Sequence, residues 1–546
     1  MKKSLPEKLK NLLSRLSLKQ WLSIVSCILI VLINAYAIVQ EKPIVPVLTG
    51  AAFLIYLLMF RVDLLMYLMA FCTPFSIILS SQNIHLGLSL PSEVIMISLT
   101  FLFLCRIIYD LRLDPKIVSH PISIAIFVYL GWMLLTCITS ELPVVSIKFW
   151  LSKIWFTTAC YWMLIQFVKD DRKKVVRYFN CYAVALAVVV LITTYKHSLT
   201  GFDDFHGHFI MSPFYNDHTA YGAVLAFFLP ITASCFFLPE NTKGMKIFYA
   251  ILTAILLMGF YLSFSRAAWI SLVVAIGVLI VLKLRIKLSW LVAGMLIVGT
   301  FLYFSASDIL YKMSRNSQDA SGNLTEQLQS ISNISTDASN VERLNRWTSA
   351  FGMIRERPLT GWGPGTYQFV YAPFQKSQFK TIITTDFGDG GNAHSEYIGP
   401  CAETGFPGLL TVLALVFVSL YIGIRTYNHS KDKTDRLLAL AMTLALVSYF
   451  VHGFLNNFLD TDKLSLPFWG AFAVIMLANL RMHGVNEVQG VNEEHEVHEV
   501  KEVNEEHGVN RVNEVQGEHG VNGVKEVKEE HEVKGVNGKK EEARDA

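Results

Sequence analysis

Long apolar runs separated by short polar segments extend along most of this sequence of 546 residues. A bilayer core requires about 20 apolar residues per helix, and runs near this length recur up to residue 305 and again after residue 406. We expect spans near 20–39, 44–60, 62–80, 92–110, 121–139, 146–168, 174–196, 217–238, 245–263, 267–283, 288–305, 407–427, 434–456 and 464–482. The pattern therefore predicts an all-α polytopic membrane protein with about 12–14 transmembrane helices. The short runs around 44–80 and 245–283 are also compatible with hairpins or re-entrant segments.

Polar sequence divides the chain into four regions. We expect an N-terminal transmembrane bundle at 1–305, one large, partly helical outer loop at 306–406, C-terminal transmembrane helices at 407–482 and a cytoplasmic tail at 483–546. In the tail, short Val-, Glu- and His-containing units recur without aromatic residues, so it buries too little apolar surface to fold and should be disordered.

The N-terminus has some features of a signal peptide. Basic residues precede an apolar run that ends in Ala35-Tyr36-Ala37, which resembles a cleavage site. Because further spans follow directly, we expect an uncleaved first span.

Composition agrees with a membrane protein. Hydrophobic residues make up 53% of the chain and charged residues 17%, and the mean hydropathy is +0.41. The net charge of +3 carries little information, because the placement of charge matters more than its sum in such proteins, and we expect no nucleic-acid partner. The eight cysteines show no CxxC spacing, which argues against a disulfide framework or a zinc site.

Basic residues alternate along the chain in the way that the positive-inside rule describes. Alternate short loops carry clusters of Lys and Arg, at 106–116, 169–177, 283–287 and 425–436, whereas the loop at 197–216 has none. We therefore expect both termini in the cytoplasm and the 306–406 loop on the outer face.

One arginine lies on the wrong side for this rule. Ser263-Phe264-Ser265-Arg266 falls where one expected span ends and the next begins, at the outer membrane surface. A guanidinium close to hydrocarbon requires a partner. Arg266 either grips phosphate through paired donors or is a snorkelling arginine that closes a tight hairpin.

The outer loop carries two further arginines followed by glycines. Arg343 and Arg346 begin an amphipathic stretch, and their spacing places both on one helical face; a solvated helix face is the alternative interpretation. Pro358 and Gly361 should end this helix, and Gly363-Pro364-Gly365 should form a turn. The run lacks the ending of a Walker loop, so we expect it to let backbone approach a ligand or a neighbouring helix.

A histidine stands near the end of the same loop. If a helix begins in Asn392-Ala393-His394-Ser395-Glu396, Asn392 is its natural N-cap and His394 lies in the exposed first turn. An imidazole there can accept a proton from a sugar hydroxyl near neutral pH or donate a hydrogen bond to phosphate, although loop histidines are often structural. Glu403 is a candidate for orienting His394 or an arginine, or for capping the following span.

The outer loop at 197–216 and the residues after it are rich in polar side chains. His206, His208 and Asp217 are conceivable metal ligands, but their spacing is not diagnostic, and we expect neither a metal nor a cofactor. A polar surface for the acceptor is the preferred interpretation, with Asn216 and His218 capping the next span and contacting substrate.

Taken together, these segments resemble the O-antigen ligase and polymerase superfamily of bacterial membrane glycosyltransferases. The resemblance rests on Gly207–Phe209 with Asn216–Ala220, Ser265–Trp269, Arg343–Trp347 with Arg357–Tyr367, Asn392–Tyr397 and Ala402–Gly408. The order, spacing and common outer placement of these segments carry it over roughly residues 200–410, whereas the N-terminal third is similar only as hydrophobic spans. Many relatives have Ala-His-Asn where this chain has Ala393-His394-Ser395, which puts the role of that amide in doubt.

The resemblance implies a GT-C-like membrane fold and metal-independent glycan transfer on the periplasmic side of the bacterial inner membrane. The donor would be a glycan on undecaprenyl pyrophosphate, and in a ligase the acceptor would be a sugar of the lipid A core. Arg266 with Arg343 or Arg346 would stabilise the departing pyrophosphate, and His394 would act on the acceptor hydroxyl as a general base. Direct attack at the anomeric carbon would invert its configuration.

Related activities share these motifs. A polymerase typically divides its arginines between two large outer loops, whereas the 197–216 loop has none, and a protein O-oligosaccharyltransferase often carries additional soluble sequence. We therefore favour the ligase. A transporter of lipid-linked glycans is the non-enzymatic alternative, but transporters usually place ionisable residues at mid-membrane, where Lys153 is the main example here. Glycan transfer by purified protein in detergent would distinguish enzyme from transporter.

Overall fold

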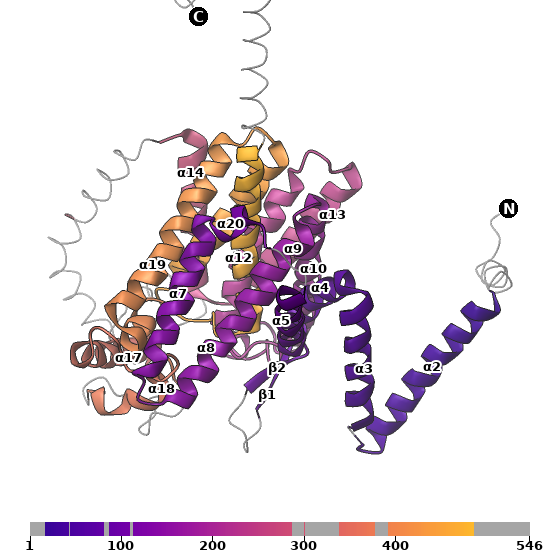
Figure 1. The fold of residues 1–546 in the computed structure, drawn as a ribbon, viewed down its shortest axis with the longest axis horizontal. Helices are drawn as coiled ribbons and strands as arrows, with labels where there is room; N and C mark the ends of the chain where they lie inside the picture. Colours follow the sequence, from indigo (N-terminus) through magenta and orange to yellow (C-terminus); the bar gives the residue numbers. More distant parts are fainter. Residues whose placement is uncertain are drawn as a thin grey trace, which may run out of the picture. The chain divides into compact units, whose positions relative to one another are not determined.

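Residues 17–42, 44–80, 87–109, 113–286, 300, 338–376 and 391–484 are described by the computed structural model (Figure 1). The chain divides into two units, Met1–Met482 and His483–Ala546, and the second is described only at residues 483–484. The expected tail, and the expected span at 288–305 apart from residue 300, lie outside the described residues.

The described part of the chain is almost entirely helical. Its long helices are α2 (Leu18–Val39), α3 (Ile44–Phe60), α5 (Ser92–Tyr109), α7 (Pro121–Ile138), α8 (Pro143–Thr157), α10 (Arg172–Leu199), α12 (His218–Phe236), α13 (Lys243–Tyr261), α14 (Arg266–Leu284), α17 (Ala338–Glu356), α19 (Ile398–His429), α20 (Lys433–His452) and Asp462–Gly484. The shorter elements are α4 (Val62–Cys72), η1 (Thr73–Phe75), β1 (Ile77–Ser80), β2 (Gly87–Leu90), α6 (Pro115–Val118), η2 (Thr158–Met163), α9 (Leu164–Val168), α11 (Asp204–Gly207), α18 (Tyr367–Val370) and η3 (Ala372–Phe374). Among the described residues, nine helices are long and apolar enough to cross a membrane. The prediction of an all-α polytopic membrane protein is therefore confirmed.

The expected span at 62–80 is wrong in its second half. The helix stops after α4 and η1, and β1 then pairs with β2 in an antiparallel hairpin. Pro74 lies in η1 and has no backbone N–H with which to continue a helix. A buried contact fastens the hairpin to the last helix, where Lys463 Nζ donates to the carbonyl oxygen of Ser76 at 2.7 Å. The segment is a short helix followed by a hairpin, which agrees with the alternative expectation that the short apolar runs around 44–80 form hairpins or re-entrant segments.

Capping side chains set the starts of several helices. Each accepts a hydrogen bond from a backbone N–H of the first turn, which otherwise has no partner. These caps are Asp171 for α10, Asp217 for α12, Thr242 for α13, Ser265 for α14 and Asp432 for α20. All five stand where a polar loop meets an apolar run, and this is why the apolar pattern predicts these starts closely.

The helices differ strongly in how far the protein encloses them. In the most apolar window of each, 94% of Asp462–Gly484 and 83% of α20 are buried, against 28% of α13 and 22% of α14. α20 packs against α12, α14 and α19. It therefore stands at the centre of this group of helices, while α13 and α14 present large apolar side chains to the surroundings, as expected of helices in contact with lipid.

Residues 338–376, which belong to the expected outer loop and are called the outer segment here, pack on one end of these helices. α17 lies against α19 and η3, and α18 also contacts α19; Figure 1 shows α17 and α18 beside the same end of α7, α8 and α19. α19 begins at Ile398, well before the expected start of its span at 407, and has one non-helical residue at Gly405. Gly405 divides this helix into two parts, and the expected boundary between 406 and 407 lies directly after that break.

Candidate functional site

The starts of α12 and α14 lie side by side. Gly222 of α12 contacts the start of α14 so closely that a Cβ on Gly222 would stand 2.7 Å from the Cβ of Ser265. Only a residue without a side chain permits this approach. As a result Arg266, the first residue of α14, interacts electrostatically with the imidazole of His218, the first residue of α12.

Asp217 caps α12, and not Asn216 or His218. Its Oδ1 accepts a hydrogen bond from the N–H of Ala220 at 2.8 Å, whereas Asn216 is exposed and His218 already belongs to the helix. A cap has to precede the first helical residue, so that its acceptor faces the unpaired amides. The expected capping by Asn216 and His218 is therefore wrong, and their contact with substrate stays a prediction.

The histidines of the 197–216 loop have different neighbours. His206 Nδ1 lies 2.7 Å from Asp203 Oδ2, while the His208 ring packs edge-to-face on His218 with 4.2 Å between centroids and stacks on Phe264. Across the described ranges, no three His, Cys, Asp or Glu side chains form a group that could hold a metal ion. The loop instead packs on the turn that precedes Arg266.

The two arginines of α17 have different surroundings. Arg346 is only 4% exposed, its Nε donates to Glu342 Oε1 at 2.6 Å, and its guanidinium lies over the Tyr371 ring at 4.3 Å. Arg343 is half-buried, and its Nε donates to the carbonyl oxygen of Leu455 at 3.2 Å. Arg346 is thus held inside the outer segment, whereas Arg343 reaches the loop that follows α20.

Arg343 interacts electrostatically with histidines from three different parts of the chain. Its charge acts on three imidazoles, those of His218, His394 and His452. Arg266 acts on the first of them as well. Arg343 therefore lies close enough to both His218 and His394 for its charge to matter, and Arg266 lies close enough to His218.

The backbone at His394 is unusual. Its φ of 48° lies in the left-handed region, which residues other than glycine adopt rarely and often at functional sites. Asn392 Oδ1 accepts a hydrogen bond from the N–H of His394 at 3.0 Å and so holds this turn. The expected N-cap at Asn392 is wrong, because α19 begins four positions after His394. The hydroxyl of Ser395 instead lies at the start of this helix, where its Oγ accepts hydrogen bonds from the N–H of Tyr397 and of Ile398, each at 3.3 Å. A serine after the histidine therefore has a structural reason in this chain.

His394 is neutral at physiological pH. Burial, and after it the positive charges of Arg343 and Arg346, lowers the pKa of His394 to about 4. The ordinary value for histidine is about 6.5. A neutral imidazole has a free lone pair on one ring nitrogen, which is the form that a general base requires.

The glycine-rich run lies against a neighbouring helix. Gly361 (φ 65°) and Gly405 (φ 73°) stand where residues 358–363, which we call the strap, cross the break in α19. A Cβ on Gly361 would lie 2.3 Å from the carbonyl carbon of Glu403. Backbone hydrogen bonds join the two segments, from Trp362 N to Ala402 O (3.1 Å), Gly363 N to Glu403 O (2.8 Å) and Phe406 N to Pro358 O (2.8 Å). The sequence predicted that these glycines let the backbone approach either a ligand or a neighbouring helix, and the structure shows the approach to a helix.

Glu403 belongs to the same junction. Its Oε1 accepts a hydrogen bond from the N–H of Tyr367 at 3.1 Å, at the start of α18. A cavity of about 240 Å³ opens beside it and is also lined by Asn392, Lys153, Glu396 and Asp460. Charged and amide side chains offer donors and acceptors that suit sugar hydroxyls. The orientation of His394 by Glu403 stays a prediction.

The loop that follows α20 is a part of the site that sequence reasoning missed. His452, the last residue of α20, is buried, and its Nε2 lies 3.2 Å from Asn456 Nδ2. Glu396 Oε1 accepts hydrogen bonds from the N–H of Phe458 and of Leu459, at 2.9 and 3.0 Å. A signal was available, because His452, Asn456, Asn457, Asp460 and Asp462 interrupt the apolar pattern at one end of an expected span.

Lys153 also belongs to this loop contact. Its Nζ donates to the carbonyl oxygen of Leu459 at 2.8 Å and to Asp460 Oδ1 at 3.0 Å. The main ionisable residue inside an expected span is therefore paired, and it fixes the loop to α8.

The comparisons with known proteins cover the part of the chain that contains the candidate site. The family model for O-antigen ligase matches residues 251–413, the range that contains Arg266, Arg343, His394 and the strap. An uncharacterized protein of Haemophilus influenzae is 23% identical over 250 residues, which are 45% of this chain and 60% of that protein; the match thus covers less than two thirds of that relative. Over residues 251–413, the chain is therefore similar to the O-antigen ligase family.

Proposed function

We propose that this protein transfers a glycan from undecaprenyl pyrophosphate to a sugar of the lipid A core. The match to the O-antigen ligase family supports this assignment. The observation that carries it is the electrostatic coupling of Arg343 to both His218 and His394, with Arg266 coupled to His218. Transfer from a diphosphate carrier needs fixed positive charge and a proton acceptor close to one substrate.

In the proposed step, a hydroxyl of the acceptor attacks the anomeric carbon of the donor sugar. The new C–O bond forms while the bond from that carbon to the diphosphate oxygen breaks, and the electron pair leaves with the diphosphate. His394 accepts the proton of the hydroxyl. Attack opposite the leaving group inverts the anomeric configuration.

The other site residues take supporting roles in this proposal. Arg266 and Arg343 stabilise the diphosphate as its charge grows, because fixed charges need no reorganisation during the reaction. Arg346 orders α17 and adds positive charge. Asn392 and Glu403, which line the polar cavity, contact the sugars of a substrate. Asn216 and His218 contact substrate from the start of α12.

The proposed reaction needs no metal ion or other cofactor. Two guanidinium groups supply the positive charge that a divalent cation supplies in many transferases of phosphorylated substrates. Treatment of the purified enzyme with EDTA should therefore leave the transfer rate unchanged. If EDTA stopped the reaction, His206, His208 and Asp217 would return as candidate ligands.

We propose that the site faces the periplasm and that both termini face the cytoplasm. α12 and α14 begin at the site and α20 ends there, so the opposite ends of these helices carry Lys283, Lys433 and Arg436. Basic residues gather on the cytoplasmic side of membrane proteins, which supports this orientation in the inner membrane.

Electrophoresis of lipopolysaccharide from a gene-deletion strain tests the assignment. Loss of every long-chain band, with accumulation of lipid-linked polymer, is the result expected for a ligase. A core that carries a single repeat would identify a polymerase instead. Transfer by the purified protein in detergent, where no compartments exist, would exclude a transporter.

A further inference from the structure

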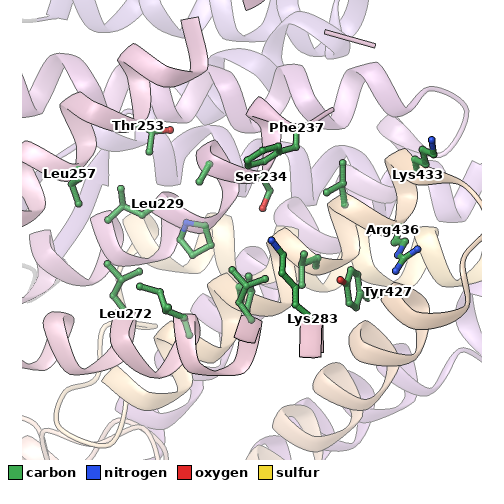
Figure 2. A pocket seen from close by; sticks show the side chains of 18 of the residues that line it. Leu229, Ser234, Phe237, Thr253, Leu257, Leu272, Lys283, Tyr427, Lys433 and Arg436 are labelled. Carbon is green, nitrogen blue, oxygen red and sulfur yellow. The ribbon is translucent and has the colours of Figure 1, made fainter. Parts of the chain in front are cut away.

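A large apolar cavity lies away from the candidate site, among α12, α13, α14, α19 and α20. Its volume is about 660 Å³, within the range of about 300–1,000 Å³ that is usual for sites of small molecules. Aliphatic side chains form most of its wall, among them Leu229, Leu257 and Leu272. Figure 2 shows these side chains toward one end of the cavity and Lys283, Tyr427, Lys433 and Arg436 toward the other.

The charged end has no neutralising carboxylate of its own. Within the described part of the chain, Lys283, Lys433 and Arg436 form no ion pair. The nearest acidic side chains on α20 are engaged elsewhere: Asp432 Oδ2 lies 2.6 Å from Arg172 Nη1, and Asp435 Oδ1 lies 2.7 Å from Arg481 Nη2. The three cations therefore leave a net positive charge beside an apolar space.

The length of the cavity matches one leaflet of a bilayer. Along α14 its lining runs from Leu272 to Lys283, and eleven residues of helix extend about 16 Å. The hydrocarbon core of a bilayer is about 30 Å thick, so one leaflet accounts for about 15 Å, close to the length of the cavity. α13 and α14, which form two of its walls, are the least enclosed of the candidate spans, so a lipid chain can reach the cavity from the membrane.

We propose that this cavity, defined here as the lipid pocket, binds an anionic glycerophospholipid of the leaflet opposite the candidate site. The acyl chains lie along Leu229, Leu257 and Leu272, and the phosphate lies between Lys283, Lys433 and Arg436. Basic pockets between transmembrane helices recognise anionic head groups in this way. The Arg436 guanidinium, 5.0 Å from the centroid of the Tyr427 ring, is held ready by this cation–π contact.

Titration of the purified full-length protein with phosphatidylglycerol or phosphatidylcholine, followed by native mass spectrometry, tests the lipid pocket. We expect one phosphatidylglycerol to be retained in preference to phosphatidylcholine. The double variant Lys433→Gln/Arg436→Gln should bind phosphatidylglycerol roughly tenfold to thirtyfold more weakly, since each basic residue near a head group contributes about one kcal/mol.

The double variant Lys243→Gln/Lys246→Gln is the matched control. It removes the same charge from α13, at exposed positions outside the lining, and should bind phosphatidylglycerol like the wild type. Ala233→Phe, which fills the cavity from α12, should weaken retention of both lipids. Glycan transfer in detergent should persist in all three variants, so failure of this proposal is separable from failure of the proposed function.

Four results would overturn the lipid pocket. Equal retention of the two lipids by the wild type would remove the role of the cations. An equal loss of affinity in the two double variants would place the lipid elsewhere. Displacement of phosphatidylglycerol by a polyprenyl phosphate at lower concentration would assign the pocket to the carrier lipid instead. Retention of no lipid at all would show that the cavity is not a lipid site.

Discussion

At the residue scale, Gly222 allows the starts of α12 and α14 to touch, and this contact brings Arg266 to His218. Arg266, Arg343 and His394 stood out because guanidinium and imidazole groups at the outer ends of apolar runs need an explanation. No pattern in the sequence predicts the contact at Gly222. The errors at Asn216 and Asn392 have a common cause. Several polar residues stand together before each helix, and the backbone path decides which one becomes the cap.

Replacement of Arg266 should damage transfer severely. Arg266→Ala should lower kcat/KM by about 10²- to 10³-fold, because a fixed donor to the leaving group is lost. Arg266→Lys should recover only part of the activity, since an ammonium group lacks the paired geometry of a guanidinium. A transfer assay with purified protein measures both changes.

Arg106→Ala is a suitable control for these variants. Arg106 is exposed in the last turn of α5, and its loss should not alter the rate. If Arg266→Ala retained wild-type activity, Arg266 would have to be removed from the site.

The pH dependence of transfer should report the environment of His394. With a pKa of about 4, the imidazole stays neutral as the pH falls through 6.5, and kcat/KM should decline only near pH 4. In Arg343→Gln, the loss of a neighbouring cation makes protonation of His394 easier and raises its pKa. The pH at which kcat/KM falls on the acid side should therefore move upward toward 6.5. A profile of kcat/KM between pH 3.5 and 8, roughly the range that brackets both values, measures the shift.

His394→Gln provides the complementary test. It should lower kcat/KM by about 10²- to 10⁴-fold and abolish the acid limb, because the group that titrates has been removed. An acid limb that persisted in this variant would belong to another residue, and the base would have to be sought among the remaining side chains of the site.

At the element scale, apolar length predicted most helices, whereas the capping residues and the tight backbone contacts did not follow from the pattern. The sequence predicts a turn at the glycine-rich run but not that the run would lie across a broken helix. Gly405 breaks α19 at the point where the strap crosses, and the two segments are forty residues apart in the chain. The hairpin of β1 and β2 was equally hidden, because its strands are short and depend on contacts with the last helix.

Substitution of the strap glycines should destabilise the protein. In Gly361→Ala the new Cβ would clash with the backbone of Glu403, and the left-handed φ of 65° adds strain of about 1 kcal/mol. The thermal unfolding midpoint of the purified protein should fall clearly. Gly131→Ala is the control, because a Cβ there meets nothing within 4 Å and the residue lies in α7; it should be neutral or stabilising by about 0.5–1 kcal/mol. Equal midpoints for the two variants would show that the strap carries no strain.

At the scale of the whole molecule, the class of fold was the most secure prediction. Apolar runs of bilayer length leave few alternatives, because a spanning chain must pair its backbone groups internally. The exact spans were less secure, as the segment at 62–80 shows. The lipid pocket could not be predicted from the sequence, since it is formed by side chains from five helices whose packing no local pattern encodes.

Removal of residues 485–546 should preserve function. This tail has the composition of a disordered segment, and none of the side chains assigned to the site belongs to it. The truncated protein should transfer glycan at the wild-type rate and unfold at the same temperature. A loss of transfer, with folding retained, would give the tail a role that its composition does not suggest.

The strap has a consequence for biosynthesis. The ribosome delivers residues 358–363 before Ala402 and Phe406, whose backbone groups complete their hydrogen bonds. The strap therefore cannot complete these hydrogen bonds until the first turns of α19 have been synthesised. A fragment that ended before α19 would lack these partners and should be cleaved by an added protease faster than the full chain.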